Sequence, residues 1–254
     1  MKIASWNVNS LKVRLPHLLE WLMREQPEVV CLQETKLEDH LFPSAALAEI
    51  GYHSACSGQK TYNGVALLAR QEISDVVRGN PFFEDEQKRL IAGTVGDVRV
   101  ISAYVPNGQA VDSEKYQYKL KWLQALNVWL GEELAARPQL VLCGDLNIAP
   151  EDRDVHDPKA WAGQILVSEP ERAAFRRLLD CGMKDSFRLF EQAERSFSWW
   201  DYRMLGFQRN QGLRIDHILL SGTLAGRCRA AGIDRAPRRL ERPSDHAPVW
   251  AVMD

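Results

Sequence analysis

Short apolar runs alternate along the chain with longer amphipathic stretches, a pattern typical of α/β proteins. The runs predict strands at residues 2–8, 29–32, 65–68, 90–95, 98–105 and 140–145, and two more after residues 216 and 246. Amphipathic periodicity predicts helices between residues 10 and 27, at 43–50, from 113 to about 136 and from 168 to 182. Residues 152–166 have no clear period and are expected to form a long loop. Without repeats or linkers, the chain is expected to be a single domain, 1–254.

Local signals mark the ends of two predicted helices. Ser113 is expected to cap the long helix, and Ser168 with Glu171 forms a capping box for the later one. Lysines on the long helix are more typical of a solvated face than of a binding surface: Lys115, Lys119 and Lys121.

Polar side chains gather where the predicted strands begin or end, in six groups: Asn7, Glu34, Tyr104, Asp145 with Asn147, Asp216, and Asp245 with His246. The first four groups follow a strand, and the last two precede one. In an antiparallel or mixed sheet, opposite ends of opposite strands meet at one edge. We therefore infer that all six groups can share one site, provided that the topology brings these ends together.

Residues 140–150 carry the strongest of these signals. Asp145 and Asn147 are two residues apart, so they point to the same side of an extended chain. A carboxylate beside an amide suits the handling of a water molecule and an anionic oxygen. The alternative interpretation is a strand that ends in an Asx-type turn before Pro150.

Two further segments leave alternatives open. Residues 57–64, which contain Lys60, fit either a hairpin turn or a loop that lies along a phosphate backbone. Residues 197–203 are aromatic and polar together, and they fit either a core strand with an amphipathic edge or a stacking surface for a nucleotide.

Composition narrows the class of protein. The chain is 45% hydrophobic and 26% charged, which is ordinary for a globular protein, and no apolar run approaches the roughly 20 residues that span a bilayer. The N-terminus lacks a signal-peptide layout, so a cytoplasmic location without membrane contact is expected. The five cysteines have no metal-ligand spacing, which argues against zinc. With a net charge of −2, any nucleic-acid surface must be a local basic patch.

The residue types in the six polar groups favour one chemistry. Carboxylates, amides, a phenol and an imidazole suit a hard cation, and Mg²⁺ takes a few carboxylates while it keeps waters for a substrate phosphate. A carboxylate can activate water, and an imidazole can donate a proton or stabilise charge. No P-loop, GxSxG motif or strand followed by GxGxxG is present. The set therefore favours metal-assisted hydrolysis of a phosphate ester over hydride or acyl transfer.

Eight motifs then occur in an order that resembles one known family: Trp6–Asn9, Leu32–Lys36, Gly58–Lys60, Ala103–Asn107, Gly144–Asn147, Phe197–Trp199, Gly212–Asp216 and Ser244–Val249. The ordered set covers essentially the whole chain and is similar to the bacterial exonuclease III (AP endonuclease) family of the endonuclease/exonuclease/phosphatase superfamily. The resemblance implies a DNase I-like four-layer α/β sandwich, in which two mixed sheets pack face to face with helices outside.

The resemblance also implies an activity. It implies a monomeric repair nuclease that uses one or two Mg²⁺ ions, or Mn²⁺ as an alternative, and cuts duplex DNA on the 5′ side of abasic sites. It further implies 3′→5′ exonuclease and 3′-phosphodiesterase or phosphatase activity on damaged 3′ ends.

Roles follow from the resemblance residue by residue. Glu34 is expected to be the main metal ligand with Asn7 beside it, Asp245 is expected near a second metal position, and the remaining expected ligands are Asp145, Asn147 and His246. Asp145 activates the attacking water, and Asn147 orients the phosphate. His246, paired with Asp216, stabilises the phosphate oxyanion. Tyr104 contacts the scissile phosphate or helps the leaving group.

The resemblance also implies two sets of substrate contacts. A pocket for a flipped-out abasic sugar is lined by Trp199, Leu213 and Ile215. The expected contacts to the DNA backbone are Lys60, Lys88, Arg89, Asn107, Lys119 and Arg203.

Residues 152–168 depart from the family pattern, so the balance between endonuclease and exonuclease activity stays open. Two rival functions are a phosphatase of inositol phosphates or a sphingomyelinase with the same fold, and a non-catalytic nucleic-acid-binding module. The apolar sugar pocket and the lack of a membrane-binding apolar hairpin argue against the first rival. The complete set of catalytic positions argues against the second.

Overall fold

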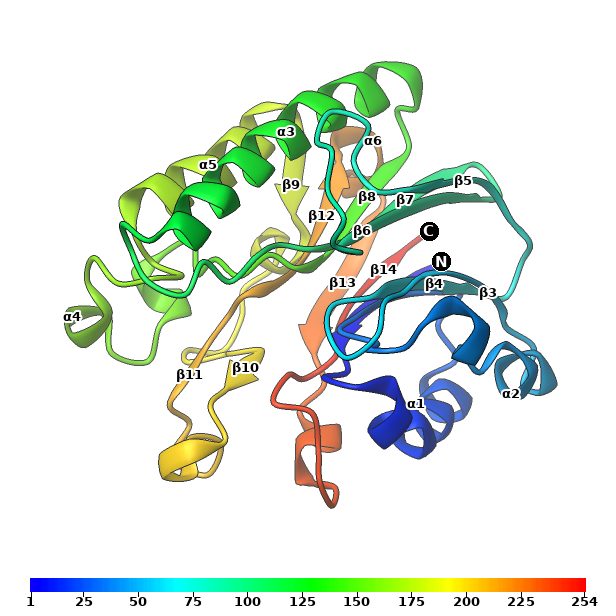
Figure 1. Cartoon of the computed structure of the whole chain (residues 1–254), viewed down its shortest axis with the longest axis horizontal. Helices are drawn as coiled ribbons and strands as arrows, with labels where there is room; N and C mark the ends of the chain where they lie inside the picture. Colours follow the sequence, from blue (N-terminus) through cyan, green and yellow to red (C-terminus); the bar gives the residue numbers. More distant parts are fainter.

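Two six-stranded mixed sheets pack face to face in the computed structural model, which describes all 254 residues (Figure 1). The first sheet has the order β13-β14-β1-β2-β4-β3, with strands β1 Lys2–Asn7, β2 Val29–Gln33, β3 His53–Ser57, β4 Val65–Ala69, β13 Cys228–Ile233 and β14 Val249–Met253. The second has the order β5-β6-β7-β8-β12-β9, with strands β5 Ile73–Arg78, β6 Leu90–Val95, β7 Val98–Tyr104, β8 Leu140–Asp145, β9 Met183–Asp185 and β12 Asp216–Ser221. A small separate hairpin pairs β10 Trp199–Trp200 with β11 Gly212–Leu213.

Helices cover the outer face of each sheet (Figure 1). α1 (Leu11–Glu25) and α2 (Ser44–Glu49) lie on the first sheet, and α3 (Glu114–Ala136) and α5 (Glu169–Asp180) lie on the second. The connections contain the short helices α4 Pro158–Trp161 and α6 Gly222–Ala225, and 3₁₀ turns at Asp39–Leu41, Asp152–Asp154, Ser186–Leu189, Arg203–Leu205 and Ala236–Arg239. This arrangement is the four-layer α/β sandwich that the resemblance implied.

None of the helices combines the length and the apolar character that crossing a membrane requires.

The central strands bury both of their faces, which explains why their sequences are largely apolar. Ile3, Cys31 and Cys143 point into the core between the two sheets. Their neighbours Ala4 and Leu142 point outward, against the helices of the first and second sheet respectively. The two cysteines are free and buried, as small core residues.

The prediction of a long loop at residues 152–166 was wrong, because this segment contains a 3₁₀ turn and α4. Asp157 caps α4 by accepting a hydrogen bond from the Ala160 amide at 3.0 Å, and Pro158 occupies the first position of the helix. A helix of four residues is too short to show an apolar period. β5 and β13 also escaped prediction, because edge strands with largely solvated faces lack a continuous apolar run.

His217 on β12 illustrates how burial decides the charge of a core residue. Its Nε2 donates to the carbonyl of Ile148 at 2.9 Å, which leaves Nδ1 to accept from Arg214 Nη1 at 3.1 Å. Burial, together with the Arg214 charge, lowers the pKa of His217 from 6.5 to about 4.

The neutral state of His217 makes the fold sensitive to acid. A folded-state pKa below the unfolded value contributes stability above pH 6.5 that is lost as the pH falls toward 4, by about 3 kcal/mol. Urea unfolding of wild type and His217→Gln at pH 7 and pH 4.5 measures this loss. The glutamine has one acceptor and a donor but no charge to gain, so we expect its stability to depend less on pH; equal losses in both proteins would contradict the assignment.

Candidate active site

The sheet topology brings the six polar groups to one edge of the sandwich, as we inferred from the sequence. β1 and β2 run parallel, as do β7 and β8, so the residues that end or follow these strands lie together. β12 runs antiparallel to β8, and the register sets Asp216 opposite Asp145. The segment before β14 is fixed by a hydrogen bond from Trp6 Nε1 to the His246 carbonyl, at 3.2 Å.

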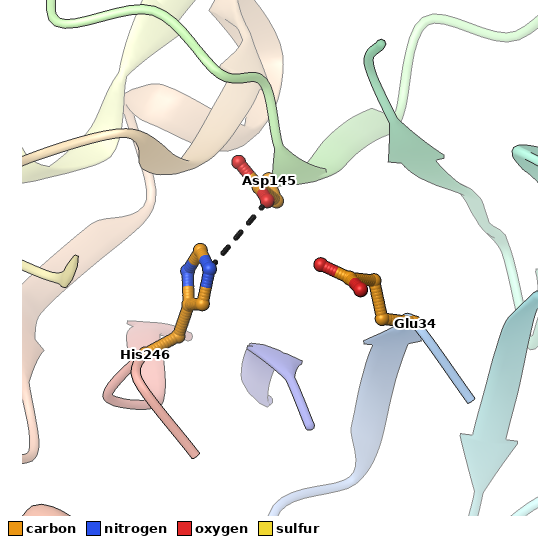
Figure 2. Close-up of side chains that lie close together, drawn as sticks. All are labelled: Glu34, Asp145 and His246. Carbon is orange, nitrogen blue, oxygen red and sulfur yellow. Dashed lines mark ion pairs between the residues drawn. The ribbon is translucent and has the colours of Figure 1, made fainter. Parts of the chain in front are cut away.

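Glu34, Asp145 and His246 form the centre of the site, and their side chains converge (Figure 2). One potential ligand atom from each lies within 4.8 Å of the others. Asn7 Nδ2 donates to Glu34 Oε1 and to Asp145 Oδ2, at 2.9 Å in both cases. Lys36 Nζ forms an ion pair with the other Glu34 oxygen at 2.9 Å. Two carboxylates that repel each other are thus held side by side by one amide and one ammonium group.

The Asx-type turn predicted for the Asp145 segment is confirmed, and the turn leaves Asp145 and Asn147 side by side at the site. The backbone N–H of Asn147 donates to Asp145 Oδ1 at 3.0 Å, and this hydrogen bond closes an Asx-type turn. The turn places Asn147 at φ 50°, in the left-handed region, and its Nδ2 donates to the Val105 carbonyl at 2.9 Å. Its Oδ1 accepts from Asn107 Nδ2 at 3.2 Å. The turn therefore builds an amide pair next to the carboxylates.

His246 and Asp216 form a buried ion pair. His246 Nδ1 lies 2.9 and 3.1 Å from the two Asp216 oxygens, and Nε2 lies 3.7 Å from Asp145 Oδ2. Burial opposes a charge on the imidazole, but Asp216 and Asp145 outweigh it and raise the pKa of His246 to about 10. The ring is therefore protonated at neutral pH, which places an imidazolium between the Asp216 and Asp145 carboxylates.

Two other groups in the site also have shifted pKa values. Burial raises the pKa of Asp145 to about 7, although the His246 charge opposes this, and a base with such a pKa suits proton abstraction near neutrality. Burial, aided by the Glu34 and Asp145 charges, raises the pKa of Tyr104 well above its usual range. The phenol therefore remains an O–H donor, with the Arg89 guanidinium 4.6 Å from its ring centroid.

Asp245 lies outside the group of three. Its oxygens accept from Asn9 Nδ2 at 2.9 Å and from Trp199 Nε1 at 3.0 Å. Asn9 in turn accepts from Lys36 Nζ at 2.6 Å, which links Asp245 indirectly to Glu34. Lys36 and Asn9 were not assigned from the sequence. The sequence could have indicated that Asn9 lies at the site, because Asn9 is two residues from Asn7 and only Val8, which is buried, separates them.

Most of the predicted backbone contacts lie on the surface around this edge. Lys60, Lys88, Asn107 and Arg203 are exposed, and Arg89 is half-buried. Residues 57–64 form the connection of the β3–β4 hairpin, and Gln59 Oε1 accepts from the Lys88 amide at 2.7 Å. A groove of about 730 Å³ beside Asn107 is lined by Arg89, Lys115 and Tyr118, among others. Arg203 is paired with Asp201, so its charge is partly compensated.

Lys119 was wrongly predicted to lie on a solvated face and to contact the DNA backbone. It is completely buried and forms an ion pair with Glu171. The reason is geometric, because position 119 lies on the inner face of α3, one turn before Trp122 and Leu123.

The residues predicted to line a sugar pocket are closely packed. Leu213 and Ile215 are 0% and 2% exposed, and they form one apolar cluster with Leu166 and Val155, with Trp199 packed against it. Leu166 has φ 73°, a conformation unusual for leucine, and is itself 4% exposed. The side chains therefore contact each other and do not line an open surface.

Comparison with known proteins agrees with this site. A model of the Endonuclease/Exonuclease/phosphatase family matches residues 4–246. Exodeoxyribonuclease III of Haemophilus influenzae is 43% identical over 99% of both chains. A 3′ phosphatase from Neisseria, solved with a product DNA hairpin, superposes with a TM-score of 0.98 and 48% identity over 100% of this chain and 99% of that one. An AP endonuclease from Archaeoglobus fulgidus gives a TM-score of 0.96 and 41% identity, over 100% and 99%. The chain therefore belongs to the Endonuclease/Exonuclease/phosphatase family, as a nuclease of the exodeoxyribonuclease III type.

Proposed function

We propose that this nuclease repairs duplex DNA, and that it hydrolyses phosphoesters at abasic sites and at damaged 3′ ends with a bound Mg²⁺ ion. The observation that carries the proposal is the convergence of Glu34, Asp145 and the His246–Asp216 pair beside the Asn107–Asn147 amide pair. The exposed lysines at the same edge supply the local positive charge that a phosphate backbone needs.

The donor set fits a hard divalent cation. Glu34 and Asp145 present carboxylate oxygens on the same side of the site, and Asn7 Nδ2 donates to both of them. The two carboxylates would hold the ion, with Mn²⁺ as an alternative, and Asn7 could join them only through Oδ1, which accepts from the Asn9 amide at 3.0 Å. When bound, the cation polarises a phosphoryl oxygen and stabilises the leaving oxygen. A second ion at Asp245 has weaker support, because Asn9 and Trp199 already donate to both of its oxygens.

Side chains of the protein fill the remaining catalytic roles. Asp145 takes a proton from the attacking water, since burial holds its pKa near neutrality. The His246 imidazolium, fixed by Asp216, stabilises negative charge on the phosphate. Asn147, held by Asn107 and Val105, orients a phosphate oxygen. Tyr104 keeps its proton and can donate to the leaving oxygen.

One observation favours 3′-end processing as the dominant activity. Incision at an abasic site requires an extruded sugar to enter a pocket, whereas a terminal 3′ phosphoester needs only to reach the carboxylates. The cluster of Leu166, Leu213 and Ile215 is closely packed where that sugar pocket was predicted, and close-packed apolar side chains leave little room.

Duplex oligonucleotides decide between the two activities. One carries a single abasic-site analogue, the other is intact with a recessed 3′ end, and each is incubated with Mg²⁺ and with EDTA. Rapid Mg²⁺-dependent incision with slow trimming would make the protein chiefly an abasic endonuclease. Fast trimming with little incision would support 3′-end processing. Hydrolysis of a small phosphomonoester or lipid without action on either duplex would contradict the proposal.

We expect Leu166→Gly to raise incision at the abasic analogue by roughly tenfold or more relative to trimming of the recessed end. Glycine adopts a positive φ without strain, and the lost side chain opens the apolar cluster. Trimming by the same variant is the internal control for folding and metal binding. An unchanged ratio of the two rates would show that Leu166 does not limit incision.

A cytoplasmic location and a monomeric enzyme complete the proposal, on the grounds of the sequence pattern and the resemblance. Light scattering of the purified protein tests the monomer.

A further inference from the structure

A buried ion pair lies directly behind the amide pair of the active site. Lys119 of α3 and Glu171 of α5 are both completely buried, and Lys119 Nζ contacts Glu171 Oε1. The same Nζ donates to the Asn147 carbonyl at 2.7 Å and to the Asn107 carbonyl at 3.2 Å. An ammonium has three N–H groups, so one carboxylate and two backbone carbonyls use all of them. Lys119 thus binds the main chain of both residues of the amide pair.

The surroundings of Lys119 are built for this contact. Gly108 has φ 91°, and a Cβ at this position would lie 3.1 Å from Lys119 Cδ and 2.9 Å from Ile165 Cδ1. Glycine therefore lets the lysine stem pass close under the chain next to Asn107. Asn147 has a left-handed backbone, a conformation that persists only where the surroundings hold it. Its carbonyl is held from behind by Lys119, and its side chain is held by Val105.

Glu171 also binds the segment at residues 152–168, which we call the rim segment. Its carboxylate accepts from the Leu166 amide at 3.0 Å and from the Ser168 amide at 3.1 Å. The Leu166 carbonyl accepts from the Ala149 amide at 2.8 Å, two residues after Asn147. One carboxylate therefore joins the rim segment at residues 152–168 to the segment that carries Asp145 and Asn147.

We infer that Lys119 and Glu171 are a positioning pair, which holds the Asn107–Asn147 amide pair in register with the carboxylates and couples the rim segment to it. The inference rests on the proposed function, in which the amide pair orients a phosphate. A buried ion pair is often no more stabilising than apolar residues of similar size, so stability alone is a poor reason for charges here. Because neither residue is accessible to DNA, their loss is expected to lower kcat and to leave KM nearly unchanged.

The test is the double variant Lys119→Met/Glu171→Gln, which removes both charges and avoids an unpaired one. We expect kcat on the preferred duplex to fall roughly 10- to 100-fold, the scale of a small misplacement of catalytic groups, with KM within about twofold. The matched control is Arg99→Met/Glu133→Gln, which removes another largely buried ion pair (2.6 Å) between β7 and the opposite end of α3. The control is expected to lose thermal stability but to keep kcat. An equal fall of kcat in both double variants, or a wild-type kcat in the first, would overturn the inference.

Two further measurements separate the possible failures. If the double variant does not fold, Glu171→Asp is measured in its place; it keeps both charges but shortens the reach to Lys119 and to the Leu166 and Ser168 amides, so we expect a smaller fall in kcat with unchanged KM, and an unchanged kcat would overturn the inference. Hydrogen exchange of the Asn107 and Asn147 side-chain amides, followed by NMR in the free protein, should accelerate in the variants but not in the control. Unchanged exchange would overturn the positioning role. Absence of DNA hydrolysis by wild type would overturn only the proposed function, since the exchange measurement needs no substrate.

Discussion

Asp145→Asn is expected to lower the rate of DNA hydrolysis by a factor of roughly 10²–10⁴ or more, while DNA affinity changes little. The amide has nearly the same shape as the carboxylate and can still accept a hydrogen bond from Asn7 or Asn147. It cannot take a proton from water, and it removes one negative charge from the cation site. Single-turnover rates at saturating enzyme, with affinity measured separately in EDTA, distinguish the chemical step from binding.

A control variant separates this effect from a general loss of charge. Asp97→Asn changes an exposed carboxylate in the turn between β6 and β7, at the opposite end of β7 from Tyr104, and should leave the rate unchanged. Wild-type turnover by Asp145→Asn would mean that another group activates the water.

Glu34→Ala is expected to be the second large effect, and one that added metal partly reverses. Loss of a carboxylate from the cation site weakens binding of the ion, and even groups that only orient ligands contribute about 10–100-fold in metal affinity. At low Mg²⁺ the variant should be nearly inactive, and its activity should recover in part as Mg²⁺ is raised. The measurement is a titration of the initial rate against Mg²⁺ after treatment with EDTA.

Glu38→Ala is the matched control for this titration. Glu38 lies four residues farther along the chain and is not part of the converging group, so its Mg²⁺ dependence should equal that of wild type. A Glu34→Ala variant whose rate is reduced equally at every Mg²⁺ concentration would exclude Glu34 as a ligand and leave it a purely electrostatic role.

Local sequence determined the central strands and the long helices of this protein. Strands buried on both faces are largely apolar, so β1, β2, β4, β6, β7 and β8 were visible as runs. The cap at Ser113 and the capping box at Ser168 use side chains within three residues, so they too were predictable. The polar residues at strand ends were visible for the same reason, because a charge that follows an apolar run marks the edge of a core.

Tertiary structure alone decided which of these residues meet and in what state. Asp145 and Asp216 are 71 positions apart in the sequence, and only the antiparallel register of β8 and β12 sets them opposite each other. The charge on His246 depends on that register, because Asp216 and Asp145 must be near enough to outweigh burial. Lys119 resembles any surface lysine until α5 supplies Glu171, and the packed state of Leu213 and Ile215 depends on Leu166 from a distant segment. Pairing energies and desolvation act between residues that are neighbours in space, so no local pattern records them.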